Sequence, residues 1–257
     1  MGCNPAPPTF FLSILNNFFY VCGMKKLFLL INFILLTISG FTQDRKGYIG
    51  ISFGPSFPIG DYASTSGEDA GYADRGINMS LVNFCYKFNE NIGIAASWHG
   101  IANPVDAQEM VEDMWSTDPS LSWELETTSW SLGGLSGGIL ISFPSNNLDF
   151  DLKALIGFAG ATSPQLDVTV SDGFSSGSAL QEELESNTSF SLSLGGGVRY
   201  HISEKWALNL SLDYFTTQVE FPEFIISLSD GTYQKAESFE QNISVLNLTA
   251  GIGYRLK

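Results

Sequence analysis

The chain has 257 residues, of which 44% are apolar and only 15% are charged, and its formal net charge is −15. A nucleic-acid partner would need a protein of the opposite sign, so this class of function is excluded. The length accommodates one large β domain or two small ones.

The N-terminal region has the pattern of a secretory signal. Lys25 and Lys26 form a basic start, an apolar run follows at 27–36, and small residues precede a plausible cleavage point after Gln43. This order of basic, apolar and small residues is typical of a signal peptide. We therefore interpret residues 24–43 as a signal peptide.

The signal divides the chain into three parts. Residues 1–23 would then be an upstream extension from a misplaced start codon, and 44–257 the mature domain. An alternative is a pair of N-terminal membrane helices at 9–21 and 27–39, but both runs are short for spanning a bilayer. The mature domain would keep Cys85 as its single cysteine, so it would have no internal disulfide.

Eight segments of the mature chain alternate apolar and polar residues, as strands with one apolar face do. They lie roughly at 47–57, 76–88, 91–101, 127–143, 147–160, 188–202, 206–220 and 240–257. Tight turns at 89–90, 144–146 and 203–205 alternate with long connections at about 58–75, 102–126, 161–187 and 221–239. An even number of antiparallel strands, with short turns at one end and long loops at the other, is typical of an outer-membrane barrel. The predicted fold is all-β: an eight-stranded antiparallel up-and-down transmembrane β-barrel with short periplasmic turns and long extracellular loops.

The hairpin at 191–215 raises the question of whether its apolar face meets a protein core or lipid. Aromatic residues on the apolar faces of the strands gather at two levels. These are Tyr86, Phe88, Phe143, Phe150, Tyr200, Trp206 and Tyr254 near the short turns, and Trp98, Trp130, Phe158, Phe190 and Tyr214 near the long loops. Phe190 and Tyr200 are ten residue steps apart along the strand, which at a tilt of about 40° gives roughly 25 Å, the height of a membrane-facing band. We expect the apolar face to meet lipid, and the polar face, rich in Gly, Ser and Asn, to fill a narrow interior.

Two further features concern the strands themselves. Gly133-Gly134 or Gly137-Gly138 could mark a β-bulge in the fourth strand. The polar faces also carry seven charged residues: Lys87, Asp149, Asp151, Lys153, Arg199, Asp213 and Arg255. We interpret these as a neutralised polar core, because charges inside a narrow barrel must pair. A proton or ion relay is the alternative.

Three features of the sequence resemble those of a known family. They are the segment YIGISFGPSFPIGDY at 48–62, the glycine-spaced strands and the terminal LTAGIGYRLK at 248–257. With them, the whole mature chain resembles small eight-stranded outer-membrane barrels of the OmpA/OmpX-like kind, especially the PorT-like group. The resemblance implies insertion by the barrel-assembly machinery, which reads the last strand, although this chain ends in Tyr254-Arg255-Leu256-Lys257 rather than in Phe. Members of this family have adhesion, stability and secretion-accessory roles, so the resemblance leaves the activity open.

The two histidines, His99 and His201, are the candidates for a catalytic base. Some barrels of this size modify lipid A with a histidine, a serine and an acid, and Ser97, His99 and either Glu124 or Glu126 are the available candidates. Ser97 and His99 should point into the barrel, away from a lipid substrate. Cys85 should also point inward, as a packed small residue. We therefore expect no enzyme activity, no catalytic residues, no cofactor and no metal site.

The long connections hold most of the acidic residues, offset only by Arg75 and Lys235. We favour a solvated surface that prevents self-association over divalent-cation bridging to lipopolysaccharide. A short helix is predicted at 105–115, with one acidic face composed of Asp106, Glu109, Glu112 and Asp113. Its Met110, Met114 and Trp115 would cap the barrel mouth or meet a partner.

The last long connection, 221–239, reads as a hairpin with Asp230-Gly231 at its tip. The seventh strand could then run from 206 to about 228, and 168–173 hints at a similar extension in the preceding loop. Such protruding strands resemble the extracellular sheet of OmpX-type barrels, whose edge is open to β-augmentation. An equally supported alternative is that these protruding strands only pack against each other.

These observations predict a protein of the cell outer membrane with both termini in the periplasm. The leading hypothesis is a structural or surface-interaction role through acidic loops and a protruding hairpin, with an extracellular protein as a possible partner. A small-solute transport or ligand-binding barrel is the alternative, and a lipid A-modifying enzyme the third. Outer-membrane lipid, lipopolysaccharide and the barrel-assembly machinery are the other expected partners.

Overall fold

The computed structural model describes residues 47–256 with four gaps, at 68, 173–175, 182–185 and 229–230. The expected upstream extension (1–23), the signal peptide (24–43) and the alternative pair of N-terminal helices lie outside the described residues.

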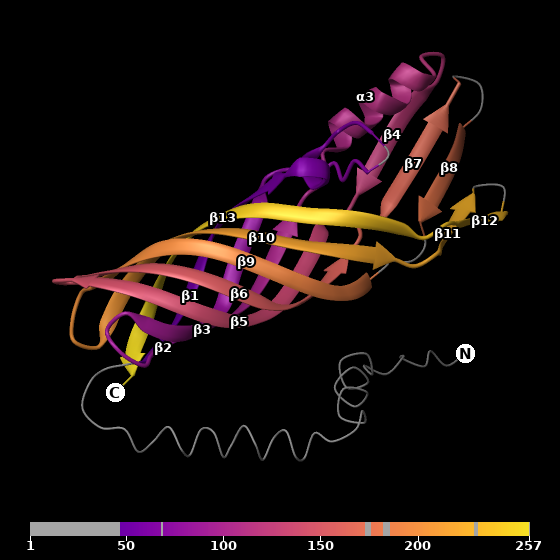
Figure 1. Ribbon diagram of the computed structural model, residues 1–257. Helices are drawn as coiled ribbons and strands as arrows, with labels where there is room; N and C mark the ends of the chain where they lie inside the picture. Colours follow the sequence, from indigo (N-terminus) through magenta and orange to yellow (C-terminus); the bar gives the residue numbers. More distant parts are fainter. Residues whose placement is uncertain (1–46, 68, 173–175, 182–185, 229–230, 257) are drawn as a thin grey trace, which may run out of the picture. The chain divides into compact units, whose positions relative to one another are not determined.

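Eight long antiparallel strands form a closed barrel (Figure 1). They are β1 (Gly47–Ile59), β2 (Gly76–Lys87), β3 (Ile92–Asn103), β5 (Trp130–Ser145), β6 (Leu148–Thr162), β9 (Ser186–His201), β10 (Trp206–Phe221) and β13 (Phe239–Leu256). Their order around the ring is β1-β13-β10-β9-β6-β5-β3-β2, and the ring closes because β1 pairs with both β13 and β2. The eight predicted strands and the three tight turns are confirmed.

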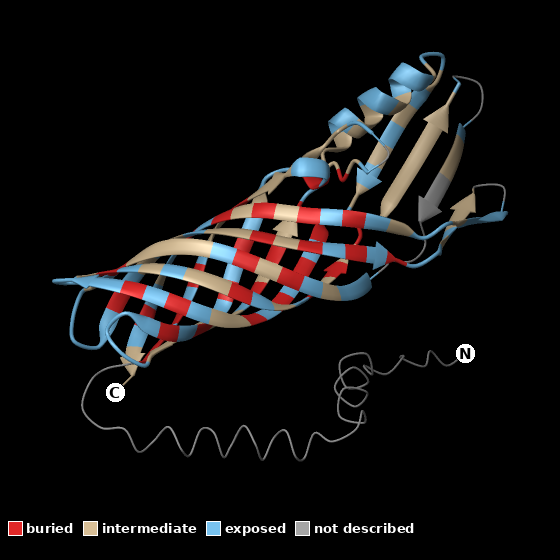
Figure 2. Cartoon of the chain, in the orientation of Figure 1, coloured by how far each residue is buried: buried red, intermediate tan, exposed pale blue. Residues whose placement is uncertain are grey.

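Buried and exposed residues alternate along the barrel strands (Figure 2), and below the long-loop end polar residues point inward whereas apolar residues point outward. On β10 the outward side chains of Leu210 and Leu212 are 54% and 53% exposed, whereas the inward Asn247 and Thr249 of β13 are 3% and 2% exposed. A soluble protein would hide the leucines, because burying apolar area is the main driving force of folding in water. The expected inverse arrangement, with the apolar face turned outward, is therefore confirmed.

The predicted bulge lies in a different strand. β5 pairs with β3 and β6 without a shift in register, whereas β2 shifts between Ser80 and Val82 against β3. The β5 glycines have another role: a Cβ at Gly134 would lie 2.9 Å from His99 Nε2, so the glycine leaves space for the imidazole ring.

At the long-loop end, three of the long connections build a second antiparallel sheet. It consists of β4 (Ser122–Thr127), β7 (Leu166–Ser171), β8 (Ser176–Gln181), β11 (Phe224–Leu228) and β12 (Tyr233–Ala236), in the order β12-β11-β8-β7-β4. The predicted hairpin is present as β11 and β12, and Gly231 at its tip has φ +81°, a conformation that suits glycine. Asp230 lies outside the described residues.

The expectation that one strand runs from 206 to 228 is wrong. β10 ends at Phe221, and β11 begins at Phe224 and pairs with β8 instead of continuing in the barrel wall. Pro222 stands at the break, and its ring nitrogen cannot donate a ladder hydrogen bond.

The first long connection carries a short 3-10 helix, η1 (Gly60–Ala63), and the second carries α3 (Ala107–Thr117). The predicted helix at 105–115 is thus confirmed, two residues later than expected. No helix in the described part of the chain is long and apolar enough to cross a membrane.

Candidate functional site

The interior near the short turns is filled by paired charges. Lys87 Nζ lies 2.8 Å from Asp149 Oδ2, Lys153 Nζ lies 3.0 Å from Asp213 Oδ1, and the Arg199 guanidinium binds the Asp151 carboxylate. These partners come from β2, β6, β9 and β10, so the network joins opposite walls of the barrel. Because each buried charge has a partner of opposite sign, the cost of desolvation is offset, which matches the predicted neutralised core.

The space left inside is small. A cavity of about 60 Å³ touches Tyr48, Cys85 and Arg199, and another of about 20 Å³ touches His99. Since one water molecule occupies about 30 Å³ in the liquid, these cavities hold at most a few waters. In the described barrel, side chains fill the lumen, as expected for eight strands.

Above this polar zone, a plug of apolar side chains closes the long-loop end. Its buried members include Tyr62, Ile101, Trp130, Phe215, Val219, Phe221, Ile243 and Val245. Of the three residues expected to cap the mouth or meet a partner, Met110 of α3 packs against the plug, whereas Trp115 is 56% exposed.

Trp130 corrects the predicted aromatic levels. It was expected to face lipid, but its side chain is buried in the plug, and its Nε1–H donates to the Gly71 carbonyl at 2.9 Å. The reason is that the apolar pattern changes phase near the mouth. Along β10 the outward residues are apolar up to Tyr214, and from Phe215 on the apolar residues point inward. This change is visible in the sequence and could have located the plug.

The candidate catalytic residues do not come together. Ser97 Oγ donates to Asn83 Oδ1 at 3.3 Å, and the His99 ring packs edge-on against Phe215, with centroids 5.0 Å apart. Glu124 and Glu126 lie on β4 in the second sheet, where they pair with β7. Cys85 lines the small interior cavity, as predicted.

The helix α3 is fixed by its own acidic residues. Asp106 caps the N-terminus by accepting from the Glu109 backbone N–H at 3.1 Å, and Asp113 Oδ2 accepts from the Tyr72 hydroxyl at 3.2 Å. Partial burial and the Asp113 carboxylate raise the pKa of Tyr72, so the hydroxyl remains a donor at neutral pH. Among the described residues, no group of three or more His, Cys, Asp or Glu side chains could hold a metal ion.

The register of the second sheet separates its side chains into two faces. On one face, Leu125 of β4 lies opposite Val168 of β7, and Leu228 of β11 falls in the same row. On the other, Glu126 lies opposite Asp167, and the row continues across β8 to Ser227 and Tyr233 of β12. The sheet therefore has an apolar face and a second face, called the acidic face, which carries carboxylates on β4 and β7 and also Lys235 on β12, opposite Ile225.

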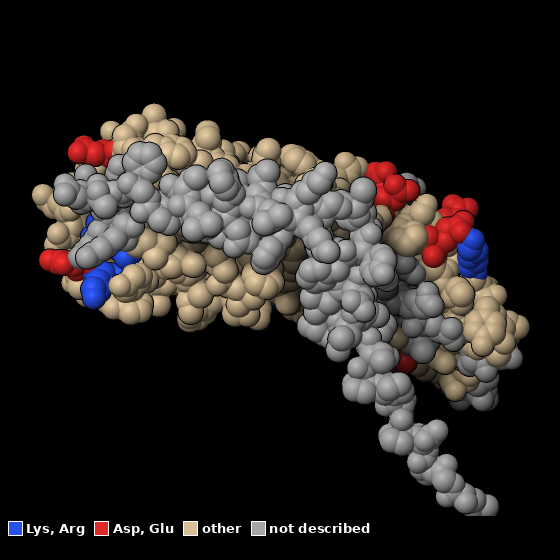
Figure 3. Space-filling model, turned by 90° about the horizontal axis from the view of Figure 1, so that it is seen from below, with Lys and Arg blue, Asp and Glu red and all other residues tan. Residues whose placement is uncertain are grey.

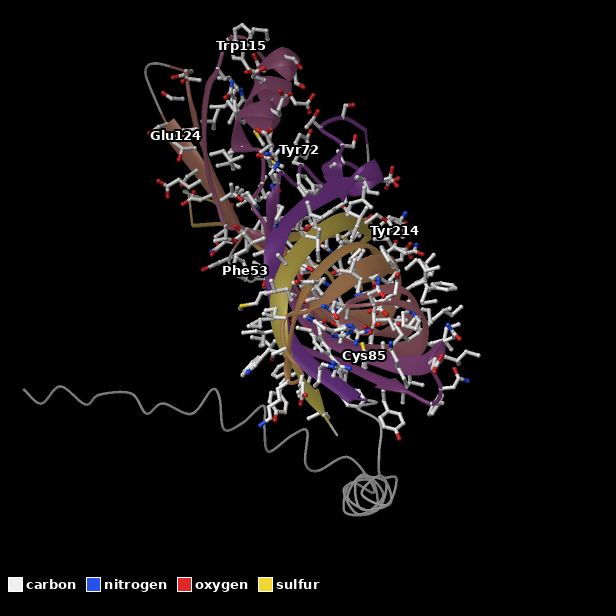
Figure 4. The ribbon with its side chains drawn as sticks, turned by 90° about the vertical axis from the view of Figure 1, so that its left-hand side faces the viewer. Phe53, Tyr72, Cys85, Trp115, Glu124 and Tyr214 are labelled. Carbon is white, nitrogen blue, oxygen red and sulfur yellow. The ribbon has the colours of Figure 1, made fainter. Side chains whose placement is uncertain are left out.

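The acidic face also carries exposed apolar groups. Tyr233 is 68% exposed and Ile225 is 40% exposed. In Figure 4, Glu124 points to the side of β4 away from α3, and α3 packs against β4. On the side shown in Figure 3, charged side chains are visible toward both ends of the described surface. The acidic face, defined by Glu124, Glu126, Asp167, Ile225 and Tyr233, is the candidate interaction surface.

Comparison with known proteins gives one family. The model of the outer membrane protein β-barrel domain matches residues 33–255. No curated protein matches the chain. Solved structures with a similar fold include Neisserial surface protein A (13% identity, 82% of this chain and 97% of that chain, TM-score 0.47) and Ail, the attachment invasion locus protein of Yersinia pestis (15% identity, 82% and 99%, TM-score 0.39). The outer membrane protease OmpT from Escherichia coli is also similar (10% identity, 82% and 97%, TM-score 0.35).

Proposed function

Because the chain belongs to the outer membrane protein β-barrel domain family, we propose that it is a non-enzymatic surface protein that binds a basic protein partner through the acidic face of its second sheet. The barrel anchors this sheet in the outer membrane. The proposal rests on a hydrogen-bonded sheet that carries Glu126 and Asp167 in facing positions at its β4–β7 end and the exposed Tyr233 in the same row on β12, three strands from Asp167.

The composition of this face fits a binding site for protein. A large exposed side chain such as Tyr233 is the usual energetic centre of an interface, and charged residues at the rim select a partner of opposite sign. The sheet is also ordered before binding, so association costs less conformational entropy than it would for a free loop.

The orientation follows from the barrel. Gly47 pairs with Leu256, so the barrel strand that starts the described chain and the one that ends it meet at the short-turn end. Barrels of this kind place their short turns in the periplasm and their long loops outside. We therefore propose periplasmic termini and an extracellular second sheet. We expect the barrel-assembly machinery to insert the protein.

The absence of catalysis is part of the proposal. The serine and histidine candidates contact other groups: Ser97 bonds with Asn83 and His99 packs on Phe215. We expect a His99→Gln variant, expressed in cells, to leave the mass spectrum of lipid A unchanged. A lipid A species that depends on His99 would overturn this part.

The interaction itself is tested with the protein in nanodiscs on an array of basic peptides that carry one aromatic residue, with charge-inverted peptides beside them. Tyr233→Ala should weaken binding about tenfold, the size of loss typical of an interface centre. Glu124→Lys should also weaken it, whereas Glu112→Lys, an equal charge change on α3, should not. Equal binding to both peptide classes, or equal effects of Glu124→Lys and Glu112→Lys, would overturn the proposal.

A further inference from the structure

The barrel wall separates between β9 and β10 at the long-loop end. Their ladder runs from Ala207 opposite His201 to Thr217 opposite Ser191 and ends there. Beyond this point, residues 186–190 of β9 still pair with β6, and residues 218–221 of β10 still pair with β13. Two strand edges thus face each other without a backbone ladder.

A groove of about 630 Å³ occupies this separation. Two side chains cross it: Asn187 Nδ2 donates to the Glu220 carbonyl at 2.7 Å, and Thr217 Oγ1 donates to the Phe190 carbonyl at 2.9 Å. They satisfy two of the carbonyls that the missing ladder leaves free. The groove is large enough for a small ligand, whose sites usually measure about 300–1,000 Å³.

The groove lies at the level where lipid headgroups begin. Open strand edges do not occur in contact with hydrocarbon, because their N–H and C=O groups would have no partners there. At its base, Phe190 packs edge-on against Phe158 of β6 with centroids 6.4 Å apart, and these two belong to the upper aromatic level. On this part of β10 the buried Val219 and Phe221 belong to the plug, and they alternate with the exposed Gln218 and Glu220, which line the groove on the outer side of the wall. The groove therefore opens sideways, toward the outer leaflet.

The lining is polar and contains no basic residue among those described. Besides Phe190 and Leu192, the lining consists of hydroxyl, amide and carboxylate side chains, among them Thr188, Gln218, Glu220, Glu240 and Asn242. Glu220 lies directly opposite Glu240, and Gln218 Nε2 donates to Glu240 Oε2 at 2.7 Å. Two carboxylates in opposite positions repel each other, so a ligand that donates hydrogen bonds to them is favoured.

From this chemistry and position, we propose that the groove binds the sugar headgroup of a neutral glycolipid in the outer leaflet. Sugar hydroxyls donate to the carboxylates and accept from the amides, and a sugar ring can pack on Phe190. A phosphate headgroup would need a positive partner, which the lining does not supply. The lipid's acyl chains would lie along the apolar wall below. This site is distinct from the acidic face of the second sheet, so either proposal can fail alone.

The test uses the full protein in phosphatidylcholine nanodiscs that contain a diglycosyl diacylglycerol, with bound lipid measured by native mass spectrometry. Gln218→Leu/Asn242→Leu removes two amides, and Thr188→Trp fills the groove. The double variant should reduce retention of the glycolipid about tenfold, the loss expected for two hydrogen bonds, and Thr188→Trp should reduce it at least as much because the indole occupies the site. Ser131→Leu, at an exposed position on β5 at the same end of the barrel, is the matched control and should bind as the wild type does. Heat-shifted gel migration confirms that each variant is folded.

Three further measurements show which part of the lipid the groove recognises. Equal retention of diacylglycerol with the same acyl chains would overturn the proposal, because the sugar would then be irrelevant. Preferential binding of phosphatidic acid with Ca²⁺ would overturn it in favour of a cation bridged by Glu220 and Glu240. Free disaccharide should compete only weakly, and complete competition at equal concentration would overturn the membrane-lipid assignment. Groove variants that behave like Ser131→Leu would also overturn the proposal.

Discussion

Trp130 packs edge-on against Tyr62, with their ring centroids 5.6 Å apart. Tyr62 belongs to η1 in the first long connection, whereas Trp130 begins β5, so this contact fixes a loop to the barrel mouth. The indole also packs against Phe221 at the end of β10. Trp130 thus joins three separate segments and is the centre of the plug.

Trp130→Ala should destabilise the barrel by about 3–5 kcal/mol, the usual cost of removing a large buried aromatic side chain. Urea unfolding in detergent micelles, followed by tryptophan fluorescence and gel migration, measures this change. Trp98→Ala is the matched control, because Trp98 is outward-facing and exposed on the neighbouring strand β3. Equal losses for the two variants would contradict the assignment of Trp130 to a buried plug.

The plug and the ion-pair network together predict that the barrel does not conduct ions. Each alone obstructs the lumen, and the interior cavities in the described barrel have room for only a few waters. Purified protein in planar bilayers should give no single-channel steps above those of protein-free bilayers. Steady steps of one size would favour the alternative of a transport barrel.

The barrel could be predicted from the sequence because its signal is local. Strand residues alternate between lipid and lumen with a period of two, and the three tight turns fix which strands are neighbours. Leu208, Leu210 and Leu212 therefore identified the outward face of β10 without any knowledge of its partners.

The mouth could not be predicted in the same way, because there the inside becomes apolar. The rule that apolar residues face lipid placed Trp130 on the wrong side, although the change of phase at Phe215 marks where the rule stops. The second sheet depends on pairing between three loops that are distant in sequence. Only β7 and the hairpin were anticipated, and β4 was missed although 122–127 alternates in burial. The separation of β9 from β10 depends on the register in which these two strands pair, and the register cannot be read from the amino-acid composition.

The pair formed by Arg199 and Asp151 should be costly to break. Their side chains are 6% and 15% exposed, so Arg199→Leu leaves a carboxylate in the barrel without its partner. Loss of one member of a buried pair typically costs about 3–5 kcal/mol. Urea unfolding should show this loss for Arg199→Leu and a much smaller one for Lys205→Leu in an exposed turn.

The double variant Arg199→Leu/Asp151→Leu separates the charge effect from packing. Replacing both partners by apolar groups removes the unpaired charge, so most of the lost stability should return. If the double variant is as unstable as Arg199→Leu, then shape and not charge pairing determines the stability at this position.

A charge placed on the outer wall should reveal where the membrane lies. Leu210 stands midway between Trp206 and Tyr214 on β10, and Thr216 lies beyond the upper aromatic level. An arginine costs about 2–4 kcal/mol at the bilayer midplane and about 0–1 kcal/mol near the interface. Leu210→Arg should therefore reduce stability in lipid vesicles strongly, and Thr216→Arg only slightly. Both can be measured by urea unfolding in the same vesicles. Equal costs at the two positions would mean that the hydrocarbon layer extends over Thr216, and the β9–β10 separation would then lie in lipid, where open strand edges are not tolerated.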